Sequence, residues 1–385
     1  MVAHMRDAVV VEAVRSPVGR RNGGLADVHP ADLSAHILEA LAERSGIAPD
    51  RVDDVIWGCG AQVGDQSFNI ARSAVLGAGW PEAVPATTID RQCGSSQQAV
   101  HFAAAGVVSG QYDVVVAGGV ESMSRIPLGS SANGGEPYGP RALARYDGEF
   151  PHQGVGAQMI ADRWKLDRAQ LDEFALASHA RAAAAQDAGH FGEQIAPYTK
   201  PDGSVVATDE GVRRGGTPGS MAGIRPAFRP DGAITAGNSS QISDGAAALL
   251  IVGDDVAAQL GMTPIARVHT AVVTGDDPLI MLTGPIPATA KLLSRSGLSI
   301  EDIGTFEVNE AFASVVLAWL AETGADPARV NPDGGAIALG HPIGGSGARI
   351  MTTMLHRMRR DQVRYGLQTM CEGGGMANAT LLELL

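Results

Sequence analysis

The sequence contains an internal duplication, which restricts the chain to folds built from two similar halves. Residues 45–57 (SGIAPDRVDDVIW) and 296–308 (SGLSIEDIGTFEV) carry apolar residues at matching positions, with an offset of about 251 residues. This offset is too long for a solenoid repeat and suits a duplicated domain. The length of 385 residues agrees, because a single hydrophobic core stops growing at roughly 250–300 residues.

Each copy continues with the same order of predicted elements. In the first copy, residues 97–108 predict a helix that is apolar or small on nearly every face, and 112–119 predict a buried strand. In the second copy, the helix covers 348–358 and the strand covers 365–370. Alternating strands and helices predict an α/β protein with parallel sheets, and the two Ala-rich helices should be buried between the halves.

The two halves are separated by a segment that has no counterpart. Residues 121–244 are rich in Gly, Pro and Arg around 129–145, and they predict an amphipathic helix near 167–188. Long insertions of this kind usually carry specificity or assembly surfaces. We therefore predict three parts: an N-terminal half at 1–120 and 245–262, an inserted loop domain at 121–244, and a C-terminal half at 263–385.

The composition argues against several classes of protein. A formal net charge of −13 disfavours a nucleic-acid partner or an anionic membrane surface, because both need clustered Lys and Arg. Three widely separated cysteines predict neither a disulfide framework nor a metal site. No targeting segment is apparent, and no apolar run approaches the roughly 20 residues that a spanning helix requires. We expect a cytoplasmic protein.

Cys93, in the stretch 90–98 (DRQCGSSQQ), lies where the first of the two buried helices begins. The unpaired N–H groups and the dipole at a helix N-terminus favour thiolate, and Gly94 lets a substrate approach closely. A buried structural cysteine is the alternative, since free cysteine is commonly buried. The duplication aligns Cys93 with Gly344, in 340–349 (GHPIGGSGAR), and so favours a site built from two equivalent turns.

Three further residues are candidates for chemistry at this paired site. His341 precedes the second turn and is a candidate base for a thiol proton, with a turn histidine bonded to backbone as the alternative. Cys371 follows a strand and precedes three glycines, so it is a candidate for proton transfer, or else a core residue. Asn309 ends a strand and can hold a water or bind an oxyanion, although capping a turn is commoner. Cys59 is interpreted as core.

Seven motifs occur in order along essentially the whole chain: DRQCGSSQQA, AGGVESMSRIP, AGNSSQISDGAAA, LTGPIPAT, VNEAFA, GGAIALGHPIGGSGAR and CEGGGMANA. Together they resemble the thiolase family, specifically a 3-ketoacyl-CoA thiolase or acetyl-CoA acetyltransferase, and most closely its actinobacterial degradative members. The resemblance implies a thiolase fold, with two duplicated βαβαβαββ halves in five α-β-α-β-α layers and an inserted loop domain. It also implies a homodimer or homotetramer, with the insertion as the contact surface in a tetramer.

The resemblance implies a role for each matching residue. Cys93 matches the nucleophile that becomes acylated, and His341 matches the histidine that activates this thiol. Asn309 matches the residue that holds a water in an oxyanion hole shared with His341. Cys371 matches the group that exchanges a proton with the carbon next to the thioester. The backbone N–H groups of Cys93 and Gly373 match a second oxyanion hole.

The resemblance also implies contacts with the substrate. Arg213 and Ser220 match residues near the adenine and phosphate end of coenzyme A, and Arg suits phosphate through its fork of donors. Ser240 and His152 match residues along the pantetheine, and solvated loop residues are the alternative for all four. Met281 matches a residue of the acyl pocket. No permanent cofactor is implied, because coenzyme A and acyl-CoA are substrates.

Two positions depart from the family pattern. Asp333 stands where many relatives have an amide, which should alter hydrogen bonding or proton affinity before the His341 turn. Gln153 follows His152 where biosynthetic acetoacetyl-CoA thiolases usually have Met, which weakens a strictly short-chain interpretation.

These observations predict an acetyl-CoA C-acyltransferase that cleaves 3-ketoacyl-CoA through an acyl-thioester on Cys93, in the degradation of fatty acids or sterol-derived acyl-CoA. Three alternatives stay open. A biosynthetic acetoacetyl-CoA thiolase would use the same residues, whereas a decarboxylating ketoacyl synthase should have His in place of Asn309. A non-catalytic acyl-CoA or lipid carrier of the same fold would bind acyl-CoA without cleaving it.

Overall fold

Two half-sheets form the framework of the protein, and the four strands of the second correspond in order to four of the five strands in the first. The computed structural model describes residues 6–148, 150 and 152–385. The strand order of the first half-sheet is β4 (Ala86–Ile89), β3 (Asp54–Gly58), β5 (Val114–Ser122), β8 (Ser243–Gly253) and β1 (Ala8–Arg15). The order of the second is β10 (Thr305–Val308), β11 (Tyr365–Glu372), β12 (Met376–Leu384) and β9 (Ala266–Gly275).

The half-sheets join edge to edge through β1 and β9. Only two residue pairs make this connection, Val9 with Arg267 and Val10 with Ala266. The short strand β2 (Gly19–Arg20) pairs with β8, off the main path of the sheet. The joined sheet is therefore continuous in hydrogen bonding but narrow where the two halves meet.

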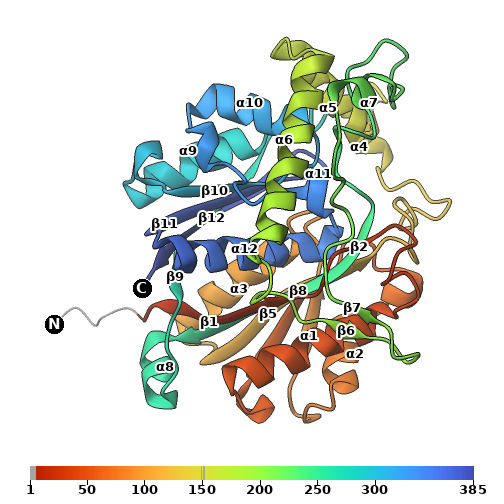
Figure 1. Ribbon diagram of the computed structural model, residues 1–385. Coiled ribbons are helices and arrows are strands. Elements are labelled where there is room, and N and C mark those ends of the chain that lie inside the picture. Colours follow the sequence, from red (N-terminus) through yellow and green to blue (C-terminus); the bar gives the residue numbers. More distant parts are fainter. Residues whose placement is uncertain (1–5, 149, 151) are drawn as a thin grey trace.

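Helices complete five layers, with the two halves one above the other in Figure 1. Helices α1 (Pro30–Ser45) and α2 (Ile70–Gly77) cover the outer face of the first half-sheet. Helices α9 (Pro285–Ser296) and α10 (Ala313–Thr323) cover the outer face of the second. Between the half-sheets lie α3 (Ser95–Ser109) and α12 (Ser346–Asp361), as the sequence predicts.

The duplication is visible in the start of each matching element. Helices α3 and α12 begin at Ser95 and Ser346, which are 251 residues apart. Strands β5 and β11 begin at Val114 and Tyr365, again 251 residues apart. The predicted pairing of Cys93 with Gly344 therefore holds in three dimensions.

Side chains alternate between layers because successive residues of a strand point to opposite faces. In β5, Val114 and Val116 pack with the outer helices, whereas Val115 and Ala117 pack with α3 and α12. Both faces are covered, which explains why the strand is apolar without interruption.

The sheet is mixed, so the expectation of parallel sheets is correct only for the strands at the outer edge of each half, away from the junction of the halves. Strand β3 is parallel to β4 and β5, and β10 is parallel to β11. Strands β8 and β12 return antiparallel, beside β5 and β11 respectively. Periodicity failed to reveal this because a strand buried on both faces has the same apolar pattern in either direction.

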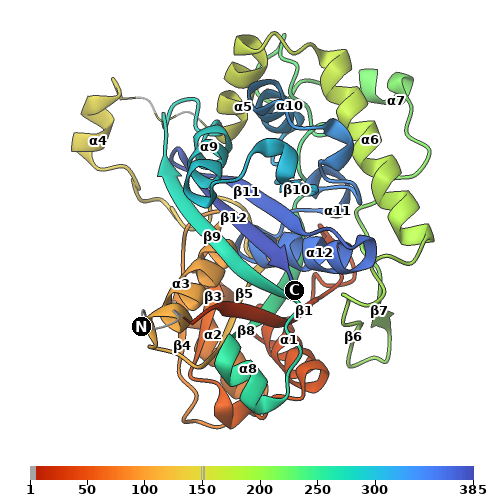
Figure 2. The ribbon, with the colours of Figure 1, turned by 90° about the vertical axis from the view of Figure 1, so that its left-hand side faces the viewer.

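The insertion runs along one side of the layers. It contains the long helix α6 (Arg168–Asp187), the shorter α5 (Gln153–Arg163) and the small pair β6–β7 (Tyr198–Thr199 and Val205–Val206). Asp167 caps α6 through a capping box with Gln170, which fixes its start close to the predicted residue. Helix α4 (Pro140–Arg145) stands away from the rest of the chain in Figure 2. The remaining helices are α7 (Pro218–Ala222), α8 (Asp254–Leu260) and α11 (Ala336–Leu339).

Close contact between α3 and α12 predicts that Gly347 is intolerant of a side chain. A Cβ on Gly347 would lie 2.3 Å from the backbone nitrogen of Gln97, so one helix would have to move. We expect Gly347→Ala to lower the free energy of unfolding by about 1–3 kcal/mol, despite the better helix propensity of Ala. Urea denaturation measures this. Gly275→Ala is the control, since no atom lies within 4 Å of its added Cβ, and an equal loss there would contradict the explanation.

Candidate active site

The four predicted catalytic residues lie at the ends of the central elements and are brought together by them. Cys93 immediately precedes Gly94, the N-cap of α3, and His341 lies between α11 and the turn that starts α12. Asn309 follows β10 and donates its backbone N–H to the carbonyl of Thr369 at 3.1 Å, on the neighbouring strand β11. Cys371 lies two residues further along β11. The two equivalent helix starts therefore carry Cys93 and His341, and two neighbouring strands of the second half position Asn309 and Cys371.

The two cysteine thiols are neighbours, and both are buried. Cys93 packs against Met370 and Ile350. Burial raises the pKa of Cys93 to about 12, and the nearby carboxyl of Glu372 raises it further. Burial also raises the pKa of Cys371 well above its ordinary value, followed by the effect of Cys93 itself. The sequence predicted a thiolate at the helix start, but here desolvation outweighs the helix dipole. A base must therefore remove the Cys93 proton as the thiol attacks.

His341 is held as a neutral base. Its Nδ1 lies 2.6 Å from Ser346 Oγ, and that hydroxyl donates its own hydrogen to the Pro342 carbonyl at 2.8 Å. Ser346 Oγ therefore accepts from Nδ1–H, which leaves the lone pair on Nε2. Nε2 is buried and has no hydrogen-bond partner among the described residues. Burial, followed by the charge of Arg349, lowers the pKa of His341 to about 3, so the ring is uncharged at neutral pH.

Asn309 presents a free amide. Its side-chain oxygen and nitrogen are buried, and neither has a hydrogen-bond partner in the described part of the chain. The strand before it is fixed by Asn331, which donates to the carbonyl of Val308 and accepts from its N–H, both at 2.8 Å. An amide that is rigidly placed and unpaired is suited to hold a water or an oxyanion.

The glycine turn after Cys371 brings Gly373 to the turn that carries Cys93. A Cβ on Gly373 would lie 3.1 Å from the side-chain oxygen of Gln92, the residue before Cys93. Gly374 and Gly375 have φ angles of 84° and 74°, a region that favours glycine. The backbone N–H groups of Cys93 and Gly373 thus belong to adjacent turns, as a second oxyanion hole requires.

Three aromatic side chains, which we call the aromatic wall, form a row of ring contacts from the exposed His152 through Phe228 to the buried Phe312. His152 caps α5 and stacks on Phe228, with ring centroids 5.3 Å apart, and Phe228 meets Phe312 edge-on at 6.1 Å. Phe312 packs in one cluster with Met281 and Cys371. Phe228 and Phe312 were not among the residues singled out in the sequence. Phe312 lies within VNEAFA, three residues after Asn309, whereas Phe228 comes from a loop without a pattern.

The remaining predicted substrate contacts fall in two places. Ser240 donates its backbone N–H to the carbonyl of Ala311 at 2.9 Å, beside Asn309. Arg213 and Ser220 lie on an exposed segment of the insertion. Thr217 caps α7 in a capping box with Ser220, so the hydroxyl of Ser220 already has a structural role. The guanidinium of Arg213 has no ion pair among the described residues.

Asp333 is the centre of a charged cluster. Its carboxylate accepts from His190 and Arg357, each at 3.2 Å, and from Arg360 at 3.3 Å. Two arginines therefore compensate the charge that replaces the amide of many relatives. Asp333 was predicted to alter hydrogen bonding at this position. The structure shows its partners, which are Arg357 and Arg360 on α12 and His190 just after α6.

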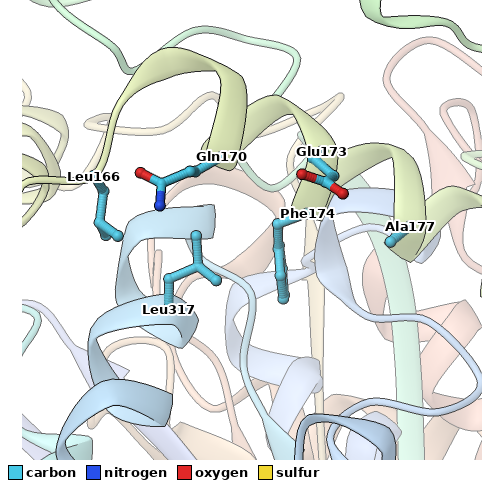
Figure 3. Close-up of a pocket in the computed structure, with 6 residues that line it drawn as sticks. All are labelled: Leu166, Gln170, Glu173, Phe174, Ala177 and Leu317. Carbon is cyan, nitrogen blue, oxygen red and sulfur yellow. The ribbon is translucent and has the colours of Figure 1, made fainter.

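The hollow drawn in Figure 3 is not this site. It measures about 290 Å³, lies between α6 and α10, and none of the candidate residues lines it. Its walls come from Leu166, Gln170, Glu173, Phe174, Ala177 and Leu317. Within 6–148, 150 and 152–385, no group of His, Cys, Asp or Glu side chains is arranged to hold a metal ion. In the same ranges, no helix has the length and apolar character needed to cross a membrane.

Comparison with known proteins decides the family. Residues 8–255 match the model of the thiolase N-terminal domain, and residues 262–384 match that of the thiolase C-terminal domain. The chain belongs to the thiolase family. This thiolase is 49% identical to steroid 3-ketoacyl-CoA thiolase FadA6 of Mycobacterium tuberculosis, across 100% of its own chain and 95% of that protein. It is 44% identical to the 3-ketoacyl-CoA thiolases of Yersinia pestis and Serratia proteamaculans, covering 99% and 98% of its own chain and all of theirs.

The hydrogen bond between Ser346 and His341 predicts that removing the Ser346 hydroxyl lowers kcat. Ser346→Ala removes the acceptor for Nδ1–H, so the imidazole no longer has a fixed tautomer or orientation. We expect kcat to fall at least about tenfold with a smaller change in KM, by analogy with other residues that orient a histidine. Steady-state kinetics measure this, with Ser109→Ala, at the far end of α3, as the control. An unchanged kcat would refute the role of Ser346.

Proposed function

We propose that this thiolase catalyses the CoA-dependent cleavage of 3-ketoacyl-CoA, with Cys93 as the nucleophile. The observation that carries the proposal is a pair of neighbouring buried thiols together with a buried His341 whose Nε2 has no hydrogen-bond partner among the described residues, in surroundings that favour the uncharged form of all three groups. Such a set can move protons between neutral groups, which the reversible cleavage of a carbon–carbon bond needs. The names of the relatives support the same reaction, because they are 3-ketoacyl-CoA thiolases.

In the first half-reaction, the sulfur of Cys93 attacks the 3-keto carbon while His341 Nε2 takes its proton. The bond between C2 and C3 then breaks, leaving the acyl group on Cys93 and an acetyl-CoA enolate. A carbanion of this kind forms only if its oxygen is stabilised, a role we assign to His341 and to a water held by Asn309. Cys371 donates its proton to C2 and completes acetyl-CoA.

In the second half-reaction, coenzyme A replaces acetyl-CoA and gives its thiol proton to the Cys371 thiolate. The CoA sulfur attacks the acyl-thioester, and the N–H groups of Cys93 and Gly373 bind the oxyanion that develops. Cys93 leaves as thiolate and recovers its proton from His341. Every group returns to its starting protonation state, which gives a ping-pong cycle without a permanent cofactor.

We propose that the insertion, residues 121–244, carries most of the CoA contacts. The unpaired guanidinium of Arg213 is placed to bind phosphate, with Ser220 close to it in sequence, whereas Ser240, His152 and Met281 line the path to Cys371. We further propose a homodimer or homotetramer in the cytoplasm. The three free cysteines fit a reducing compartment, and Phe68, with 96% of its surface exposed, fits a face that a second copy covers.

For the acyl group, we propose a substrate of degradation, derived from a fatty acid or a sterol, rather than acetoacetyl-CoA alone. The segment 129–153 is the part that would select it, because this segment carries both α4 and His152. A panel of straight-chain, branched and ring-bearing 3-ketoacyl-CoA substrates, compared by kcat/KM, tests the choice. A marked preference for acetoacetyl-CoA would instead favour a biosynthetic thiolase.

Replacing each of the two cysteines should cause a different loss of activity. Cys93→Ala is expected to abolish both thiolysis of acetoacetyl-CoA, followed by absorbance, and the acyl adduct detected by mass spectrometry. Cys371→Ala should still form an adduct on Cys93 from a simple acyl-CoA but should lose carbon–carbon cleavage by at least about 10²-fold, because only cleavage needs a proton at C2. Thiolysis that survives Cys93→Ala would refute covalent catalysis, and tight binding without thiolysis would favour a carrier.

A further inference from the structure

Glu372, the last residue of β11, is a buried acid that the reaction above does not use. Its side chain is fully buried, and neither carboxyl oxygen has a hydrogen-bond partner among the described residues. The carboxyl lies against the start of α3, since a Cβ on Gly94 would be 2.0 Å from Glu372 Oε1. An unpartnered carboxyl therefore lies directly beneath the turn that carries the nucleophile.

The duplication provides an internal reference for this acid. Glu121 is the last residue but one of the equivalent strand β5, 251 residues earlier in the chain. Its carboxylate accepts from the side chain of Gln66 and from the backbone N–H groups of Gly60, Ala61 and Gly344. Gly344 is the counterpart of Cys93. In the first copy the acid binds the turn of the other half, whereas Glu372 does not bind the N–H of Cys93, which has no acceptor among the described residues.

The surroundings of Glu372 disfavour a negative charge. The charged and titratable groups that face it are Asp90 and Arg91 from the loop before α3, together with the thiols of Cys93 and Cys371. Burial raises the pKa of Glu372 to about 8, and of the two nearby charges Arg91 lowers this pKa and Asp90 raises it. At neutral pH the group is therefore mostly an uncharged carboxylic acid.

We propose that Glu372 is a positioning residue that must be uncharged for acyl transfer, and that its ionisation turns the thiolase off. The inference rests on the proposed function. Glu372 is flanked in the chain by Cys371, which donates a proton to C2, and by Gly373, whose N–H binds an oxyanion. A carboxylate here opposes ionisation of both thiols and repels the negative charge that develops beside Cys93.

The pH dependence of kcat/KM tests the proposal. In the wild-type enzyme, kcat/KM should fall by about tenfold per pH unit above the ionisation of Glu372. In Glu372→Gln, which has the same shape and no charge, this alkaline limb should move up by at least about one pH unit. Ionisation of the substrate and of coenzyme A is common to both enzymes, so the difference between the profiles belongs to Glu372. An unchanged alkaline limb in Glu372→Gln would overturn the proposal.

Thermal unfolding provides a second readout that does not need activity. Because the pKa of Glu372 is raised on folding, the native state holds a proton that the unfolded state releases as pH rises from about 4.5 to 8. Over that window the wild type loses stability that Glu372→Gln does not lose. The difference in Tm between variant and wild type should therefore widen with pH up to about 8. A difference that is constant with pH would also contradict an uncharged Glu372.

Two further variants keep the test decisive. Glu121→Gln removes the equivalent acid of the first copy, and it should lower Tm but leave the alkaline limb in place. If Glu372→Gln does not fold, Glu372→Met removes the same charge with an apolar side chain of similar length and should move the limb equally. A wild-type enzyme that shows no thiolysis at any pH would refute the proposed function, whereas the Tm comparison would still decide the state of Glu372.

Discussion

The active site depends on the packing of α3 against α12 in the layer between the half-sheets. The two helices meet closely enough that a side chain on Gly347 would collide with the backbone of α3. This contact brings the turn of Cys93 and the turn before α12, which carries His341, to the same place. The strand ends that carry Asn309 and Cys371 border that layer. Catalytic geometry therefore depends on the deepest part of the core, where displacement costs most.

Burial also determines the chemistry. Removing both thiols and His341 from water favours their uncharged forms, so the resting site holds no ion pair between cysteine and histidine. In the proposed mechanism, negative charge appears only during the reaction, and the N–H groups of Cys93 and Gly373 and the amide of Asn309 are assigned to receive it. Preorganised donors of this kind stabilise a transition state without reorganising water. The same desolvation explains why an acid such as Glu372 keeps its proton.

Much of this structure was predictable from the sequence, because the duplication is a local pattern repeated at a fixed offset. The thiolase family, the five layers and the two buried helices are confirmed, and Cys93 and His341 lie on equivalent turns. The thiolate predicted for Cys93 was wrong, since a helix start is visible in a sequence but desolvation is not. The partner of His341, the aromatic wall at Phe228 and the arginines around Asp333 depend on contacts between distant segments, which no local pattern records.

The division of the site between two copies bears on how such an enzyme can arise. The counterparts of Cys93 and His341 in the other copy are Gly344 and Asp90, so neither half alone contains both the proposed nucleophile and its proposed base. Two identical halves, each with one turn of this kind, would place the same residue on both sides of their symmetry axis. Different residues at two equivalent turns need two different sequences, and a duplicated chain supplies both within one molecule. The duplication thus allows one turn to carry a thiol while the equivalent turn carries glycine.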